Sequence, residues 1–355
     1  MEYIVFQISG GIGKNVIATS VVRAINMQYP DRKIVVLTAH PDIWINNPRI
    51  HKVIQFGQTS YFYDDFIKGR NTLIFTHDPY GETDAIYRRK HLSKVWCELC
   101  GVKFQGEIPE LYFTRLEKDQ VEFFINKTKP ILLIQPFGGA QTNNKYSWAR
   151  DLPPYLAQRI VDEFKNDYRV IQIKREDQTG LNGAEYLSTN PRSLALSLFF
   201  SDKRIFIDSY MQHAAAALGL SSNVFWIGNS PTVFGYEIHK NITTSFEIGS
   251  TRTSLYDPFD ISGDPIQIAT PPGNLFDTNV VMGILKDENP PMPLFSQEEN
   301  VTQFDPELPK LPSISIPDIT DIIPGIQIGE FVDVSGSNNE QSSEKDHKST
   351  KKAKK

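Results

Sequence analysis

The sequence predicts an α/β protein in which two doubly wound, Rossmann-like halves face one another across a cleft. Short apolar strands alternate with helical segments along the chain, which is the pattern of βαβ units with parallel strands. This pattern is interrupted at Lys129-Pro130 and then restarts. In each half a glycine turn follows the first strand, at Ser9–Gly13 and at Phe137–Gly139. Two successive α/β units of this kind predict two domains of similar architecture.

The first half, residues 1–128, reads as strands connected by helices. The expected strands are 3–8, 33–38, 53–56 and 71–75, and the expected helices are 14–29, 88–100 and 117–126. The first helix is expected to end at Pro30-Asp31, which interrupts it. The polar and aromatic segments 61–65 and 76–82 follow strands, which is where open α/β sheets bind their ligands.

The second half, residues 129–288, repeats the pattern. The expected strands are 131–135, 168–173, 204–207 and 223–227, and the expected helices are 154–164, 191–200 and an alanine-rich helix that ends at Gly219. Beyond this half the composition changes to a Pro-rich and then a Lys-rich segment. Because such a segment buries too little apolar surface to offset its ordering entropy, we expect residues 289–355 to be an extended or disordered tail. The tail is a candidate contact for a protein partner.

Length and charge narrow the class of protein. A chain of 355 residues is long enough for two domains, and its net charge of −5 gives no reason to expect nucleic acid as a partner. No apolar run approaches the roughly 20 residues that cross a bilayer, so we expect a cytoplasmic protein, either soluble or peripheral at a membrane. The two cysteines, Cys97 and Cys100, lie one helical turn apart and are expected to be buried, since no second pair completes a four-sulfur zinc site. No metal or cofactor is expected.

The strand-to-helix turn Asp208–Gln212 is a candidate ligand site. Its side chains stand at the carboxyl end of an apolar strand and beside a helix N-terminus, which favours phosphate. The helix that follows is alanine on nearly every face and must therefore pack closely. It would hold Asp208, Ser209 and His213 at a cleft. The alternatives are that Asp208 only caps the helix and that His213 is a buried histidine with satisfied hydrogen bonds.

The glycine turn Ser9–Gly13, followed by Lys14, has a second interpretation as a phosphate-binding loop. In the P-loop pattern, backbone N–H groups surround phosphate, a lysine reaches the terminal phosphates and a hydroxyl binds magnesium. Here Ile8 stands at the first glycine position and Asn15 replaces the hydroxyl. Ser9 stands where the deviant loop of partitioning ATPases has an earlier lysine. An ATPase is therefore the third of three functional hypotheses.

Several segments of the chain match one known family in their order and spacing. They are Gly13–Ile25, Tyr29–Asp31, Asn47–Ile54, Gln135–Gly139, Lys145–Trp148 and Asp208–Gly219. In these segments the sequence resembles glycosyltransferase family nine, the ADP-heptose lipopolysaccharide heptosyltransferases, which have a GT-B fold. The resemblance covers most of residues 3–235 and leaves the tail out.

The resemblance implies transfer of a sugar from a nucleotide-diphosphate donor to a glycan or lipid-linked acceptor, without an essential metal. The second half would hold the donor and the first half the acceptor. By position, Lys145 would neutralise the diphosphate. Asp208 and Ser209 would hold donor hydroxyls or phosphate, and His213 would complete the donor pocket. This arrangement suits an inverting displacement, in which a carboxylate accepts the proton of the acceptor and positive charge stabilises the leaving diphosphate.

The chain departs from the family at two positions. Where the family has an aspartate that looks like the general base, this chain has Lys14, and a protonated lysine cannot act as a base unless its pKa is strongly lowered. Tyr210 replaces a glycine in the turn after Asp208. The candidate bases in strand-end loops are Asp78, Glu82 and Asp42, and the candidates to hold the acceptor or a phosphate are Gly10, Gly11, Gly13 and Lys14. If no acid replaces the base, the chain is a GT-B-derived binding or structural protein, which is the second hypothesis.

Overall fold

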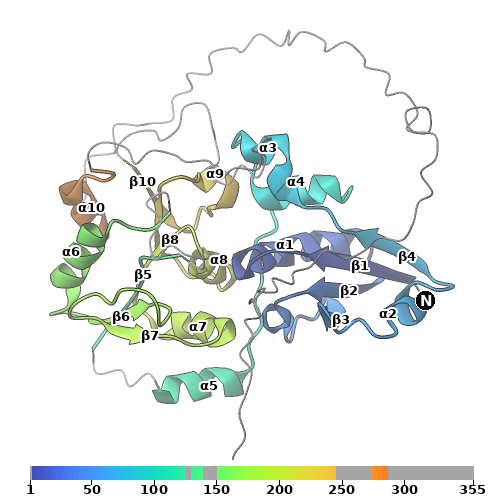
Figure 1. Ribbon diagram of the computed structural model, residues 1–355, viewed down its shortest axis with the longest axis horizontal. Coiled ribbons are helices and arrows are strands. Elements are labelled where there is room, and N and C mark those ends of the chain that lie inside the picture. Colours follow the sequence, from blue (N-terminus) through green and yellow to red (C-terminus); the bar gives the residue numbers. More distant parts are fainter. Residues whose placement is uncertain (1, 125–128, 139–149, 245–273, 287–355) are drawn as a thin grey trace, which may run out of the picture. The chain divides into compact units, whose positions relative to one another are not determined.

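The computed structural model of the chain describes residues 2–124, 129–138, 150–244 and 274–286, with the backbone alone over 120–124. Within these ranges the helices and strands form two separate sheets flanked by helices (Figure 1). The expected tail, 289–355, and the end of the expected helix 117–126 lie outside the described residues.

The first sheet is parallel and has the strand order β3-β2-β1-β4. Its strands are β1 (Glu2–Ile8), β2 (Lys33–Thr38), β3 (Ile50–Gln55) and β4 (Asn71–Phe75). Helix α1 (Ile12–Gln28) connects β1 to β2, which pair from Tyr3 opposite Lys33 to Ile8 opposite Thr38. The strands match those expected from the sequence, and β2 and β4 have the expected bounds.

Short helices follow the strands of the first sheet. They are η1 (Pro41–Trp44), α2 (Phe62–Phe66), η2 (Pro79–Gly81), α3 (Thr83–Ile86), α4 (Leu92–Leu99) and α5 (Arg115–Phe124). The helix expected over 88–100 is thus shorter than predicted. Arg88 has a positive φ of 54°, which an α-helix does not contain. The Nδ1 atom of His91 then accepts the backbone N–H of Ser93 at 3.2 Å and caps the start of α4.

The second sheet is also parallel, with the strand order β10-β9-β8-β5-β6-β7. Its strands are β5 (Ile131–Gln135), β6 (Arg169–Ile173), β7 (Glu185–Leu187), β8 (Lys203–Ile207), β9 (Asn223–Trp226) and β10 (Lys240–Thr243). The edge strands β7 and β10 are not predicted by the sequence. They are only 3 and 4 residues long and largely exposed, so neither contains an apolar run.

The helices of the second half agree with the expected ones and add two short elements. They are α6 (Pro154–Phe164), α7 (Pro191–Ser197) with η3 (Leu198–Phe200), α8 (Tyr210–Ala217), α9 (Pro231–Phe234) and α10 (Thr278–Leu285). The alanine-rich helix predicted after Asp208 is α8, and the helix predicted over 191–200 is α7 continued by η3.

Helices α1 and α8 lie side by side and join the two halves (Figure 1). Neither has a polar face, since α1 is buried over most of its length and α8 is half alanine. One hydrophobic core contains Val21 of α1 and Ala215 of α8 together with Phe6 of the first sheet and Phe206 of the second. A helix without a polar face is a buried helix. The close packing predicted for the alanine-rich segment is therefore confirmed.

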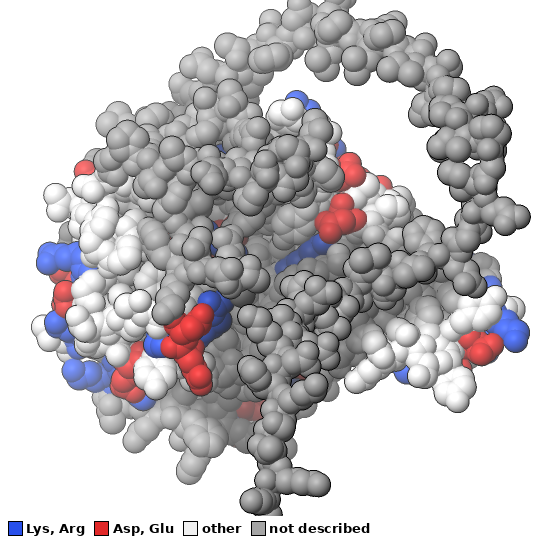
Figure 2. All heavy atoms as spheres, in the orientation of Figure 1, with Lys and Arg blue, Asp and Glu red and all other residues white. Residues whose placement is uncertain are grey.

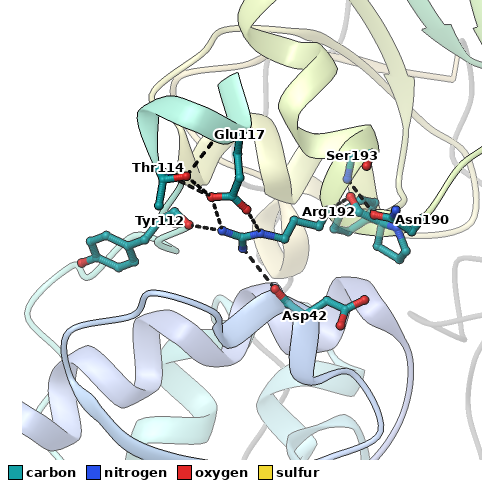
Figure 3. Close-up of polar contacts among 9 residues, drawn as sticks. Asp42, Tyr112, Thr114, Glu117, Asn190, Arg192 and Ser193 are labelled. Carbon is teal, nitrogen blue, oxygen red and sulfur yellow. Dashed lines mark hydrogen bonds and ion pairs between the residues drawn. The ribbon is translucent and has the colours of Figure 1, made fainter. Parts of the chain in front are cut away.

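Arg192 on α7 makes a second connection between the halves (Figure 3). Its side chain is 9% exposed, and the guanidinium donates to both carboxylate oxygens of Glu117 on α5, at 2.6 and 3.2 Å. It also donates to the backbone oxygen of Tyr112 at 2.6 Å and to that of Asp42 in η1 at 3.1 Å. One buried cation thus joins three segments that are distant in the chain.

We expect Arg192→Ala to lower the free energy of unfolding by about 3–5 kcal/mol, the usual cost of removing one partner of a buried ion pair. Arg169→Ala is the matched control, because it removes a two-point pair of similar geometry with the exposed Glu185. That control should cost at most about 1 kcal/mol. Urea denaturation followed by circular dichroism measures both. Equal losses would mean that Arg192 contributes no more than a surface ion pair does.

The same ion pair makes stability depend on pH. The Arg192 guanidinium, together with the backbone and hydroxyl donors of Thr114, lowers the pKa of Glu117 from its ordinary 4.5 to about 2. Ionised Glu117 therefore stabilises the folded state fully above its ordinary pKa, and this contribution is lost as the pH falls towards the folded value. The difference in unfolding free energy between the native chain and Glu117→Gln should be smaller at about pH 3 than at about pH 6. A difference that does not change with pH would contradict this account.

Candidate functional site

A cavity of about 580 Å³ lies where the first turns of α1 and α8 meet. The first half contributes Gly10–Lys14, His40, Asp78 and Tyr80. The second half contributes Arg150, Asp208–Tyr210, His213, Asn229 and Phe234. Most of these residues follow the carboxyl ends of strands, where α/β sheets bind ligands. The structure thus brings the glycine turn of the first half and the Asp208 turn of the second half into one site.

The N-termini of α1 and α8 both open into this cavity. Gly11 occupies the N-cap position of α1, and no acidic residue lies in the first turn of that helix. Ser209 occupies the N-cap position of α8 without a side-chain hydrogen bond to the helix. The first N–H groups of both helices are thus not capped by these residues. Helix dipoles and uncapped N–H groups favour an anionic ligand such as phosphate.

Lys14 is buried at the edge of the cavity. Its side chain is 6% exposed, and Nζ lies 2.6 Å from Oδ2 of Asp78. The ammonium also lies 5.1 Å from the ring centroid of Tyr80 and 5.4 Å from that of Trp96. Aromatic faces and a carboxylate both stabilise a cation that has left water. Lys14 is therefore a fixed, paired charge and not a flexible lysine at the surface.

Asp78 is held in place by three donors but keeps access to the cavity. Oδ2 accepts from Lys14 and, at 3.5 Å, from the hydroxyl of Ser9. Oδ1 accepts the backbone N–H of Tyr80 at 3.1 Å. About half of the side chain, 52%, remains exposed. The carboxylate is oriented by the protein and still within reach of a bound molecule.

The other two candidate bases stand elsewhere. Of the three acids, all within the described ranges, Asp78 alone lines the cavity. Asp42 is exposed, and its backbone oxygen accepts from Arg192 as described above. Glu82 is half-buried at the N-cap position of α3. The geometry therefore favours Asp78 over Asp42 and Glu82.

Asp208 is buried between two partners from other loops. Its backbone oxygen accepts from Nε of Arg150 at 2.7 Å, and its Oδ2 accepts from the side-chain amide of Asn229. Burial raises the pKa of Asp208, against the opposing effect of Arg150 and Asn229. Asp208 does not cap α8, because Ser209 stands at the N-cap position. The first alternative for Asp208, a simple helix cap, is wrong.

His213 is a neutral, hydrogen-bonded side chain that also lines the cavity. Its Nδ1 lies 2.9 Å from the hydroxyl of Tyr236. Burial lowers the pKa of His213 well below its ordinary value, and the positive charge of Arg150 acts in the same direction. These contacts match the alternative of a buried histidine with satisfied hydrogen bonds. The ring can act towards a ligand only as a neutral group.

Gly13 and Tyr210 lie next to His213, where α1 approaches α8. A Cβ atom on Gly13 would lie 3.2 Å from Cδ2 of His213 and 3.7 Å from the Cα of Tyr210, so glycine allows α1 to approach α8. The hydroxyl of Tyr210 donates to the backbone oxygen of Pro191 at 2.7 Å. Burial raises the pKa of Tyr210. Gly13 and Tyr210 both serve packing between helices as well as lining the cavity.

The structure adds residues that the sequence did not single out. Lys145 lies outside the described residues, but Arg150, shortly after it, lines the cavity. A Cβ on Gly138 would lie 3.1 Å from Nε of Arg150, so the second glycine turn leaves room for that side chain. His40 and Asn229 follow β2 and β9. Applying the strand-end rule to every strand would have found both of them.

Asn15 weighs against an ATPase. Its Oδ1 accepts from the hydroxyl of Thr38 at 2.6 Å and from Nε1 of Trp44 at 3.2 Å, and its Nδ2 donates to the oxygen of Gly11 at 3.1 Å. The side chain is fully buried. Asn15 stands where a P-loop needs a hydroxyl that binds magnesium. In this fold it binds η1 and β2 to the start of α1 instead.

Charged side chains of both signs lie on the surface outside the cavity. On the face shown in Figure 2, acidic and basic side chains of the described residues lie beside one another in small groups.

Within the described ranges, no three His, Cys, Asp or Glu side chains are placed to hold a metal ion. The helices of those ranges include none with the length and apolarity needed to cross a bilayer. Cys97 and Cys100 are buried free thiols, as expected.

Two parallel sheets whose strand ends share one cavity define a GT-B fold, and solved structures agree. The chain is similar to the glycosyl transferase family 9 protein of Veillonella parvula DSM 2008, with 13% identity over 70% of this chain and 88% of that chain, and a TM-score of 0.52. It is also similar to ADP-heptose lipopolysaccharide heptosyltransferase II of E. coli, with 14% identity over 72% of this chain and 94% of that chain, and a TM-score of 0.53.

A third similar structure carries a nucleotide sugar. It is the heptosyltransferase TibC of enterotoxigenic E. coli in complex with ADP-D-β-D-heptose, with 14% identity over 80% of this chain and 76% of that chain, and a TM-score of 0.52. No protein-family model matches the sequence, and no curated protein matches it. At these identities the similarity concerns the fold. The resemblance to family nine is thereby confirmed at the level of the GT-B fold.

We expect Gly13→Ala to lower the free energy of unfolding by about 1–3 kcal/mol, because the added methyl group overpacks the contact between α1 and α8. Gly11→Ala is the matched control, since a Cβ there meets no atom within 4 Å and the φ of Gly11 is −78°. It should cost at most about 1 kcal/mol, because alanine is a poorer N-cap residue than glycine. Thermal and urea unfolding of the two variants test this. If Gly13→Ala is as stable as Gly11→Ala, the helices are not in the tight contact described.

Proposed function

We propose that this chain is an inverting glycosyltransferase of the heptosyltransferase kind. It would bind a nucleotide-diphosphate sugar in the cavity between α1 and α8 and transfer the sugar to a glycan or lipid-linked acceptor. One observation carries the proposal: the cavity combines two helix N-termini, which suit a diphosphate, with an oriented and accessible carboxylate, Asp78. A cytoplasmic location, at a membrane where the acceptor is lipid-linked, belongs to the same proposal.

The donor would bind mainly to the second half. The N-terminus of α8 and Arg150 supply favourable charge for the diphosphate, and Asp208 and Ser209 lie beside them to accept or donate hydrogen bonds to sugar hydroxyls. Lys145 is expected to add positive charge, as the resemblance implies. His213 would complete the floor of the donor site as a neutral group.

The acceptor would bind on the side of the first half, along Gly10–Lys14 and Asp78. Asp78 takes the proton of an acceptor hydroxyl as its oxygen forms a bond to the anomeric carbon of the donor. The bond from that carbon to the diphosphate oxygen breaks at the same time, and the charge that develops on the diphosphate is stabilised by the helix N–H groups and Arg150. Lys14 orients Asp78 through their ion pair and does not itself accept the proton.

The ion pair also supports a second candidate function. Because Oδ2 of Asp78 is already paired with a buried lysine, the carboxylate has a partner that competes for its lone pairs. In that case the chain would bind the nucleotide sugar without turning it over. It would then act as a binding or structural protein, with residues 289–355 as the contact for a protein partner.

We expect Asp78→Asn to lower kcat about 10²- to 10⁴-fold, the range for loss of a general base, while the Kd of the donor stays within about twofold. Asp208→Asn should weaken donor binding by about tenfold or more, because it removes a carboxylate partner of the donor hydroxyls. Donor binding is measured by calorimetry with ADP-, UDP- and GDP-sugars. Turnover is measured by release of the nucleoside diphosphate with and without acceptor glycans.

Asp42→Asn and Glu82→Gln are the control variants, because neither acid lines the cavity. Both should keep native kcat and native donor affinity. Donor binding without turnover in the native chain would support the binding protein over the enzyme. Failure of every nucleotide sugar to bind would refute both.

A further inference from the structure

Two segments from different halves pack against each other beside the cavity between α1 and α8. One runs over 79–91, directly after Asp78, and contains η2 and α3; the other runs over 227–234, from the end of β9 through α9. A single hydrophobic cluster includes residues of both segments. The ring centroids of Tyr80 and Phe234, which both line the cavity, lie 5.7 Å apart. The two halves are thus in direct contact at this wall of the cavity.

Arg88 reaches from the first segment to the second. Its Nη2 donates to the backbone oxygen of Gly228 at 3.1 Å. The backbone of Arg88 has a left-handed φ of 54°, which costs energy for a residue with a side chain. Two backbone hydrogen bonds hold this turn: the N–H of Arg88 donates to the oxygen of Ala85 at 3.1 Å, and the N–H of Arg89 donates to that of Asp84 at 2.8 Å. The guanidinium therefore reaches Gly228 from a fixed turn.

Asn229, the residue after Gly228, contacts Asp208. Its side-chain amide donates to Oδ2 of Asp208, and both residues line the cavity. The loop is also anchored after Asn229, because the hydroxyl of Ser230 accepts the backbone N–H of Thr232 at 3.2 Å and caps α9. Asn229 is thus held between the bond from Arg88 to Gly228 and the cap of α9.

Asp208 needs the donor from Asn229 in order to keep its charge. A buried carboxylate stays ionised only where hydrogen bonds or cations replace the lost water. Among the described residues, the titratable groups that act on Asp208 are Arg150, whose Nε bonds its backbone oxygen, and Tyr236, whose hydroxyl is kept neutral by burial. Burial raises the pKa of Asp208, and Arg150 and the hydrogen bond from Asn229 lower it. Loss of the Asn229 amide should therefore raise this pKa further.

We propose that Asn229 and Arg88 are positioning residues of the donor site: Asn229 orients the carboxylate of Asp208, and Arg88 holds Asn229 in place through Gly228. The binding of a donor by Asp208 rests on the proposed function, whereas the positioning of its carboxylate does not. Arg88 and Asp78 belong to the same connection between β4 and α4. That connection would then supply the proposed base and also fix the carboxylate on the donor side.

The role of Asn229 is tested without any nucleotide sugar. Asn229→Ala removes the amide donor, and Asn229→Asp replaces it with a second carboxylate of the same shape. The carboxyl carbon of Asp208 is titrated by ¹³C NMR on the full chain, with Asp208→Asn to assign its signal. We expect the pKa of Asp208 to rise in Asn229→Ala and to rise more in Asn229→Asp, because a like charge adds to the lost hydrogen bond. Asn223→Ala, at the other end of β9, is the matched control and should leave the titration unchanged.

The role of Arg88 is tested by donor binding and turnover. Arg88→Ala should raise the donor KM about threefold or more with kcat nearly unchanged, because it removes a charged hydrogen-bond donor that fixes the loop. It should also raise the pKa of Asp208, and Arg88→Lys should restore part of both losses. Arg89→Ala is the matched control, because its guanidinium contacts the ring of Tyr87 and the carboxylate of Asp84 in its own segment.

The outcomes separate this proposal from the proposed function. An Asp208 titration that is the same in the native chain, Asn229→Ala and Asn229→Asp would overturn the role of Asn229. Equal behaviour of Arg88→Ala and Arg89→Ala in both measurements would overturn the role of Arg88. If the titration shifts as expected but no nucleotide sugar binds, the positioning of Asp208 is supported and the proposed function fails.

Discussion

The close contact between α1 and α8 is the constraint on which the rest of the site depends. Both helices are buried without a polar face, and Gly13 has no side chain where the His213 ring and the backbone of Tyr210 approach. This contact brings two helix N-termini, one from each sheet, to a common volume. The electrostatic character of the cavity is therefore a result of packing: the helices must meet in order to bury their apolar surfaces, and their dipoles meet with them.

Lys14, at the start of α1, determines the position of the carboxylate in this cavity. A lysine in the first turn of a helix is disfavoured by the dipole, and a buried lysine needs an anion. Asp78 meets that need from the loop after β4, and the rings of Tyr80 and Trp96 support the ammonium from the sides. A carboxylate thus remains at the edge of the cavity even though the start of α1 carries the opposite charge. This carboxylate comes from the loop after β4 and not from the start of α1.

Much of the fold follows from local patterns in the sequence. Strands β2 and β5 and helix α6 have the expected bounds, because they are buried and their apolar residues are continuous or periodic. Strand β4 also has the expected bounds, although it is only partly buried. The edge strands β7 and β10 bury little and leave no such pattern. The strand-end rule selects Asp78 and Asp208, and both line the cavity. The burial of Lys14 is not predictable locally, since it depends on Asp78, Tyr80 and Trp96, all more than 60 residues away in the sequence.

The hydrogen bonds of Arg192 constrain the amino-acid sequence at some contact positions and not at others. Two of its acceptors are backbone oxygens, those of Tyr112 and Asp42, and only Glu117 contributes a side chain. Every amino acid supplies a backbone oxygen, so the identities of residues 42 and 112 are free to drift without removing these acceptors. Within this joint, only Arg192 and Glu117 depend on the identity of their side chains. A different residue at position 42 of η1 would still offer its backbone oxygen to Arg192.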